Sequence, residues 1–473
     1  MPHTRHHGGA AEIDMLNGPL MGKIWKFALP IAASAFLQQL FNAADNAVVG
    51  NFAADKTSAL GAVGGNAFVI GLMVNLFIGM SVGANVVMAS YRGQKNDEGV
   101  NKALHTAVTF SLICGVVLGC IGLIMAPAIH GWLGTGGEGS ALRQQAVLYF
   151  RIYFAGLPFN MLYNYESAIM RSKGDTRRPL VVLAFSGILN VALNILLVAV
   201  FHMEVAGVAI ATVISNAFSS VALFVMLSRE EGAYRLSPKK LGIDGKMLAR
   251  MVQIGLPAGV QTSMFSIANV ILQGEINALG DTVIAATTVG LYAEFFAYDF
   301  IAGFSQAATT FVGQNYAVGN TKRCREITRI CWCCGTGLTV AVCGLLTLLR
   351  TQFVSVFTPE TAVIAVAAER VLRVGSLQFL NGSGEILSGS MRGMKRSLVP
   401  ALISVLGVCG VRLVWVWAFY PGLTSGEMLN DHAMLCVAWP LSWGITAASV
   451  AVAYFITRGR AEREIGRLAA REA

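Results

Sequence analysis

The chain has 473 residues, of which 55% are hydrophobic and only 13% are charged, and its formal net charge is +9. Soluble domains carry about 25% charged residues, so this composition and a mean hydropathy of +0.60 exclude an ordinary soluble protein. The basic excess does not indicate nucleic-acid binding, because the basic residues lie at the ends of apolar segments, as they do at a membrane surface.

The apolar residues are gathered in segments of membrane-spanning length, which is about 20 residues for a helix. In chain order the sequence predicts twelve spans, near 24–50, 59–90, 101–127, 144–170, 180–201, 206–227, 250–279, 284–315, 326–349, 362–391, 398–420 and 434–457. We therefore expect an all-α integral membrane protein.

The spans form two related halves of six. Five identities, Asn160/Asn381, Ser167/Ser388, Met170/Met391, Arg171/Arg392 and Pro179/Pro400, are each 221 residues apart, and Leu29-Pro30 and Leu256-Pro257 are 227 apart. Paired repeats in a membrane are typical of secondary transporters. Because each half has an even number of spans, we expect two six-helix lobes related by a pseudo-two-fold axis along the membrane normal.

The distribution of basic residues predicts the orientation of the chain in the membrane and the boundaries of its parts. Of the 35 Lys and Arg residues, 28 lie in the N-terminal region, in every second connection after it and in the C-terminal tail. This positive-inside pattern predicts both termini in the cytoplasm. The predicted parts are an N-terminal tail (1–23), an N-lobe (24–227), a cytoplasmic linker (228–249), a C-lobe (250–457) and a basic tail (458–473).

Several motifs occur in a distinctive order: FNAADNAVVG (41–50), GMSVGANVVMASYRGQKN (79–96), SAIMRSKGDTRRP (167–179), GFSQAATTFVGQNYAVGN (303–320) and SGSMRGMKRSLVP (388–400). With Leu29-Pro30, they make the chain resemble the multidrug and toxic compound extrusion (MATE) family from about residue 15 to 457, and most of all its prokaryotic DinF-like branch. The resemblance implies a two-lobed, twelve-helix antiporter that expels organic, often cationic, compounds in exchange for protons or sodium.

Asp45 is the sharpest functional candidate, because it lies inside the first apolar span. A charged side chain at the centre of a bilayer costs about 2.5–3.5 kcal/mol or more, and intramembrane acids are functional candidates for that reason. Such a carboxylate can exchange a proton or coordinate sodium. The alternative is a carboxylate near the outer end of the span that faces water.

The resemblance extends this site. In the DinF-like branch the coupling aspartate follows a helix-1 proline and a glutamine, and an Asn and an Asp four residues apart on helix 5 join it. The matching ion-coupling positions are Gln38, Asp45, Asn190, Asn194 and Thr212, with Pro30 as the hinge. Asn194 departs from the branch by removing the second carboxylate, although its carbonyl oxygen can still ligate sodium. The coupling ion is thus H+ or Na+, with Asp45, Asn190 and Asn194 as the sodium ligands.

Other polar residues inside spans are predicted to line a substrate cavity: Asn42, Asn164, Glu166, Glu294, Asp299 and Glu385. For Glu294 and Glu385 the alternative is structural pairing with Arg373 or Arg412. The nine cysteines lack the spacing of a metal site, and the sequence predicts neither a resident metal nor a cofactor.

Three functions remain after these observations. The first is export of small organic cations by a monomer in a prokaryotic plasma membrane, with the lipid bilayer and no nucleic acid as partner. The second is a lipid-linked saccharide or metabolite flippase of the same superfold, which would have a strongly basic central cavity. The third is a membrane-embedded transferase, which needs paired Asp motifs or a His-Asp pair that the sequence does not show, so we expect no enzyme.

Overall fold

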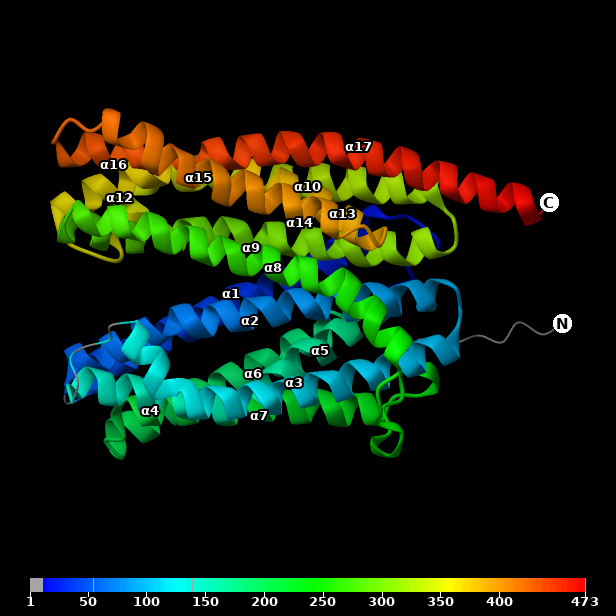
Figure 1. Ribbon diagram of the computed structural model, residues 1–473, viewed down its shortest axis with the longest axis horizontal. Helices are drawn as coiled ribbons and strands as arrows, with labels where there is room; N and C mark the ends of the chain where they lie inside the picture. The colour runs from blue at the N-terminus through cyan, green and yellow to red at the C-terminus, as the bar shows by residue number, and fades with distance from the viewer. Residues whose placement is uncertain (1–11, 54, 134, 136, 138, 473) are drawn as a thin grey trace. The chain divides into compact units, whose positions relative to one another are not determined.

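Figure 1 shows the computed structural model, which describes residues 12–53, 55–133, 135, 137 and 139–472. Every regular element within these residues is a helix, which confirms the predicted all-α fold. The first eleven residues of the predicted N-terminal tail, and Ala473 of the C-terminal tail, lie outside the described residues.

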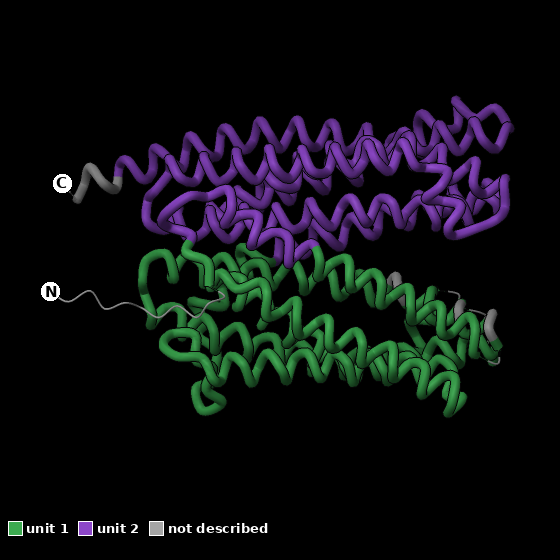
Figure 2. The backbone as a smooth tube through the Cα atoms, turned by 180° about the vertical axis from the view of Figure 1, so that it is seen from behind, with its two compact units in different colours: residues 1–14, 33–255 green, residues 15–32, 256–473 purple. Residues whose placement is uncertain are grey.

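Internal contacts divide the chain into two compact units, coloured in Figure 2. The first unit comprises residues 1–14 and 33–255, and the second comprises 15–32 and 256–473. These boundaries differ from those of the predicted lobes, because the beginning of the first helix groups with the second unit and the beginning of the eighth helix groups with the first.

The first unit is a bundle of long helices that run side by side (Figure 1). Its elements are α1 (Met21–Phe52, from residue 33), α2 (Lys56–Gly93), α3 (Asp97–Trp132), α4 (Ala141–Ala155), α5 (Leu157–Lys173), α6 (Arg177–Asn194), the π-helix η1 (Ile195–Val200), α7 (Glu204–Ser228), and the 3-10 turns η2 (Gly232–Tyr234) and η3 (Pro238–Lys240). Helix α5 is central, since it packs against α2, α3 and α7.

The second unit is built in the same way around α9, which packs against α10, α12 and α13. Its elements are α8 (Gly245–Ala278, from residue 256), α9 (Asp281–Ala317), α10 (Thr321–Leu348), α11 (Arg350–Ser355), α12 (Thr361–Arg373), η4 (Gly375–Leu377), α13 (Gln378–Gly393), α14 (Leu398–Ser404), the π-helix η5 (Val405–Gly410), α15 (Val411–Val414), the π-helix η6 (Trp415–Phe419), η7 (Tyr420–Gly422), α16 (Met428–Cys436) and α17 (Ala438–Glu472).

Nine helical segments of the described chain are long and apolar enough to cross a membrane. The other three predicted spans are helical as well, but each has a reason to fall short. The span at 144–170 is divided between α4 and α5, which begins with Pro at its first turn. The span at 362–391 is divided by η4. The span at 284–315 lies in α9, which carries Glu294 and Asp299 in its middle.

The first half of α1 belongs to the second unit because it packs closely on α9. The Trp25 and Phe304 rings meet edge to face with centroids 5.1 Å apart. A Cβ on Gly303 would lie 2.5 Å from the backbone oxygen of Ala28, so only glycine allows this approach of the two helices. The grouping changes after Ala32, two residues beyond Pro30.

The repeat-related helix α8 makes the reciprocal contact in the first unit. A Cβ on Gly83 of α2 would lie 2.1 Å from the backbone oxygen of Met251. The grouping changes after Gly255, two residues before Pro257. Each prolyl residue, which lacks a backbone donor and weakens the helix locally, thus lies where a helix passes from one unit to the other.

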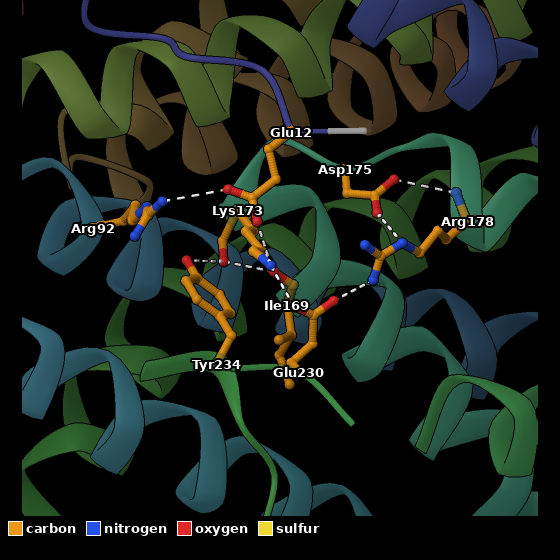
Figure 3. A network of polar contacts seen from close by, with 9 residues as sticks. Glu12, Arg92, Ile169, Lys173, Asp175, Arg178, Glu230 and Tyr234 are labelled. Atoms are coloured by element: carbon orange, nitrogen blue, oxygen red, sulfur yellow. Dashed lines mark hydrogen bonds and ion pairs between the residues drawn. The ribbon is translucent and has the colours of Figure 1, made fainter. Parts of the chain in front are cut away.

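One end of the first unit carries a network of ion pairs (Figure 3). Lys173 contacts Glu12 and lies 2.6 Å from Glu230, while Arg178 also contacts Glu230 and lies 3.0 Å from Asp175. Basic residues predicted to face the cytoplasm are therefore held by acids from the N-terminal segment and from the chain that follows α7.

Candidate ion-coupling and substrate site

Asp45 lies in the second half of α1, and its side chain is only 9% exposed within the described structure. It is therefore a buried acid inside a candidate span, not a carboxylate on the surface of a helix end. A buried carboxylate requires hydrogen-bond donors or a cation, so its partners decide what this site can do.

The main partner of Asp45 is Asn194 at the end of α6. The Asn194 side-chain amide donates to Asp45 Oδ1 at 2.5 Å and to Asn190 Oδ1 at 3.1 Å. Asn190 and Thr212 also interact with the Asp45 carboxylate. The structure thus brings together four of the five predicted ion-coupling residues.

Local packing explains why α1 and α6 approach each other here. A Cβ on Gly187 would lie 1.8 Å from the Phe41 ring, so this glycine leaves the space that the ring fills. Phe41 precedes Asp45 by four residues and Gly187 precedes Asn194 by seven, which places each pair on one helical face. The contact between Phe41 and Gly187 therefore sets the distance between the carboxylate and the amide.

The backbone beyond Asn194 is also unusual, because α6 continues as the π-helix η1. Short π-helical segments inside α-helices frequently occur at functional sites. In addition, Asn194 Oδ1 is buried without a hydrogen-bond partner in the described structure. An unsatisfied carbonyl oxygen beside a carboxylate suits a cation, because both groups are oxygen ligands.

Sequence reasoning missed two tyrosines of this site. Tyr149 and Tyr153 on α4 lie in the neighbourhood of Asp45, and their rings stack with centroids 6.3 Å apart. Their four-residue spacing places both on one face of α4, but nothing in the sequence directs that face toward α1.

The remaining predicted residues of the first unit are more scattered. Gln38 and Asn42 are exposed on α1, and no hydrogen bond of theirs to Asp45 occurs in the described chain. Asn164 donates to the backbone oxygen of Asn160 at 2.8 Å, so it stabilises its own helix α5. Glu166 on α5 is fully buried, and neither of its carboxylate oxygens has a hydrogen-bond partner in the described structure.

In the second unit, Glu294 and Glu385 each pair with an arginine, but the expected partners were wrong. Glu294 lies 2.8 Å from Arg370, whose side chain passes over Gly290, one turn before Glu294 on α9. Glu385 contacts Arg392 on the same helix, α13, two turns later. Glu294 therefore pairs across the contact between α9 and α12, and Glu385 pairs within its own helix.

The two arginines that the sequence predicts as partners, Arg373 and Arg412, make other contacts. Arg373 pairs with Glu369 at 2.5 Å, one turn before it on α12. Arg412 donates to Asn269 at 2.7 Å and to Ser442 at 3.2 Å. Asp299 is 6% exposed, and its Oδ2 has no hydrogen-bond partner in the described structure.

Comparison with known proteins gives a family. The MatE family model matches residues 30–196 and 257–417, which are most of the chain and fall in both halves. The probable multidrug resistance protein YoeA of Bacillus subtilis is 24% identical over 88% of this chain and 94% of its own length.

Two further likenesses agree with that match. The probable multidrug resistance protein NorM of Thermotoga maritima is 26% identical over 82% of this chain and 83% of its own length. A crystal structure of MATE in the straight conformation superposes with a TM-score of 0.84 at 18% identity, covering 96% of this chain and 98% of that one. The chain is a multi-pass membrane protein with the two-lobed, twelve-helix fold, and it belongs to the MATE family.

Proposed function

We propose that this protein exports small organic cations across a prokaryotic plasma membrane in exchange for a cation, H+ or Na+, that binds at Asp45. The similar proteins named multidrug resistance proteins support export of drug-like compounds. The orientation follows from the basic connections and places both termini in the cytoplasm. The protein works as a monomer, and its cargo and the bilayer are its partners.

One observation carries the choice of Asp45. Within the described chain no ion pair joins Asp45 to a basic side chain, and its hydrogen-bond partner Asn194 is a neutral amide. Glu294 and Glu385, by contrast, are already compensated by arginines. A cation that reaches Asp45 therefore gains a partner without displacing a resident one.

The residues present fit both coupling ions. A proton needs only the Asp45 carboxylate. Sodium needs several oxygen ligands, and rotation of the Asn194 amide would add its unsatisfied oxygen to those of Asp45 and Asn190. The second acid that the DinF-like branch uses is not required for either event, because one carboxylate can bind one proton or one sodium ion.

Coupling follows from a difference in affinity. Cargo enters from the cytoplasm while Asp45 is ion-free, and ion binding from outside favours the state that releases cargo. The two lobes alternate between these states. Each ligand shifts the equilibrium only by its differential affinity for the two states. An ion site whose geometry changes when α1 bends near Pro30 supplies such a difference in affinity.

Reconstituted vesicles test the proposal. A fluorescent organic cation is followed under a pH gradient and, separately, under a sodium gradient. We expect one gradient to drive export, and Asp45→Asn to abolish that export while the protein still folds as a single species. Asp281→Asn, which removes an exposed acid at the start of α9, is the matched control and should export normally. Transport by Asp45→Asn at the wild-type rate excludes Asp45, and no transport under either gradient excludes cation export.

A further inference from the structure

The interior of the second unit holds two arginines but only one carboxylate near them. Arg370 on α12 and Arg412 on α15 are 1% and 4% exposed, and Glu294 on α9 is 5% exposed. Glu294 lies 2.8 Å from Arg370. Arg412 has no ion pair within the described chain and donates to two neutral groups, Asn269 and Ser442. One buried positive charge therefore lacks a counter-charge.

Nearby acids do not supply that charge. Glu369 pairs with Arg373, and Asp431 accepts backbone hydrogen bonds from Ser425 and Gly426. The guanidinium of Arg412 lies 5.4 Å from the ring centre of Trp439. Such a cation–π contact offsets only part of the desolvation of a buried guanidinium, so the cluster remains suited to an anion.

Buried polar atoms without hydrogen-bond partners point the same way. Arg370 Nε is buried without a hydrogen-bond partner in the described structure, and so is Nδ1 of His432, whose side chain is fully buried. Buried polar atoms of proteins are nearly all paired. The unpaired atoms here lie on Arg370 of the cluster and on His432, which is close enough to Arg370 to be affected by its charge.

By repeat spacing, two residues of the cluster correspond to residues at or near the Asp45 site in the first repeat. Asn269 on α8 is 227 residues after Asn42 on α1, the spacing of the two Leu-Pro pairs. Arg412 is 222 residues after Asn190, one more than the spacing of Pro179 and Pro400. The π-helix η5 directly precedes α15, and each i→i+5 turn holds one residue more than an α-helical turn, which accounts for the difference.

The two equivalent sites have opposite polarity. Leu272 stands where the first repeat has Asp45, and Arg412 stands where it has Asn190. Both sites adjoin π-helical turns: η1 follows Asn194, and α15 lies between η5 and η6. The side chain of Asn269 is exposed on α8. The Arg412 nitrogen that donates to Asn269 is therefore separated from the surface of the unit by the Asn269 side chain.

We propose that Arg412 is the centre of an anion subsite in the second unit, entered past Asn269, which binds a carboxylate. A guanidinium matches a carboxylate in shape and charge and can donate two parallel hydrogen bonds to it. If the carboxylate belongs to the cargo, the proposal rests on the export function above. The cargo class is then amphoteric: organic cations that also carry a carboxylate. A free carboxylate from solution is the other source of the same chemistry.

Binding is tested first, without transport. Purified protein is titrated with benzoate or with benzamide at constant ionic strength, and its unfolding temperature is followed. We expect a saturable rise with benzoate only, and its loss in Arg412→Gln. Arg373→Gln removes an exposed arginine of the same unit and should keep the rise. No rise with benzoate in the wild-type protein overturns the subsite.

A second variant covers the case in which Arg412→Gln does not fold. Asn269→Asp places a carboxylate next to the guanidinium, so it should raise the unfolding temperature by itself and abolish the response to benzoate. Asn277→Asp adds the same charge at another exposed asparagine of α8 and should do neither. A full benzoate response in Asn269→Asp also overturns the proposal.

Transport then separates the two sources of carboxylate. A cationic rhodamine with a free benzoate is compared with the methyl ester of the same dye in reconstituted vesicles. If the cargo supplies the carboxylate, Arg412→Gln lowers export of the free benzoate dye about ten-fold, equivalent to about 1.4 kcal/mol, and leaves the ester within about two-fold. Equal effects on both dyes, with benzoate binding retained by the wild type, assign the subsite to a free carboxylate. Export of neither dye by the wild type contradicts the export function but leaves the benzoate result to decide the subsite.

Discussion

Asp45 and its neighbours show how far single residues can be predicted from sequence. Its position inside an apolar span identified Asp45, the resemblance to the DinF-like branch implied Asn190 and Asn194 as its partners, and their four-residue spacing places those two on one helix face. The choice among arginines was not predictable, since Glu294 selected Arg370 through the space above Gly290. That space depends on how two helices meet, which one sequence does not specify.

Glu230 gives a pH-dependent prediction outside the membrane spans. Burial of this carboxyl opposes its ionisation, but hydrogen bonds from Lys173 and Arg178 outweigh that effect and lower the pKa of Glu230 below its ordinary value of 4.5. A carboxyl with a lower pKa in the folded state stabilises the fold at neutral pH, and this contribution disappears as the pH falls through the folded-state pKa.

We therefore expect Glu230→Gln to destabilise the protein at neutral pH by about 1.5–3 kcal/mol, the usual contribution of a hydrogen bond to a charged group. The difference from the wild type in unfolding temperature should shrink as the pH falls below the ordinary value of 4.5. Glu231→Gln removes the neighbouring exposed charge and should change little at any pH. A difference that stays constant across this range would contradict the assignment.

At the scale of elements, the approach of α1 to α6 depends on one glycine. A Cβ at Gly187 would lie 1.8 Å from the Phe41 ring, so Gly187→Ala must push the helices apart or displace the ring. Overpacking of this kind costs about 1–3 kcal/mol. We expect a lower unfolding temperature and, because Asn194 lies two turns further along α6, weaker coupling of export to the ion gradient.

The matched control for this substitution is Gly71→Ala on α2, where an added Cβ meets no atom within 4 Å. Alanine favours a helix by about 1 kcal/mol over glycine, so the control should be neutral or stabilising. Phe41→Ala should destabilise the protein less in the Gly187→Ala background than in the wild type, because there it also removes the ring that clashes. Equal unfolding temperatures for Gly187→Ala and Gly71→Ala would show that the contact does not hold the helices in place.

For the whole molecule, the repeat and the charge pattern predict two halves, their span number and their orientation. A reporter that fluoresces only in the cytoplasm should be bright when fused after Ala473. The same reporter inserted after Ser425, in the connection between η7 and α16, should be dark, because that connection lies in the series with few basic residues. Equal brightness at both sites would contradict the positive-inside assignment.

The exchange of helix halves between the units could not be predicted. A hydropathy pattern predicts each span as a whole segment and does not reveal that residues 15–32 pack with the second unit while the rest of α1 packs with the first. The contacts responsible, such as that of Ala28 with Gly303, join residues far apart in the sequence. Only close packing of specific small residues specifies them.

This exchange also has a consequence for synthesis. The backbone oxygen of Met15 accepts a hydrogen bond from Asn315, which is translated 300 residues later. At roughly 5–20 residues per second, the delay is on the order of 15–60 s. During that interval the first half of α1 is already made but lacks the α9 surface that buries Phe27 and Ala28. A ribosome that stalls after the first unit leaves this apolar face open to lipid, chaperone or protease, so synthesis of α9 also protects the first helix.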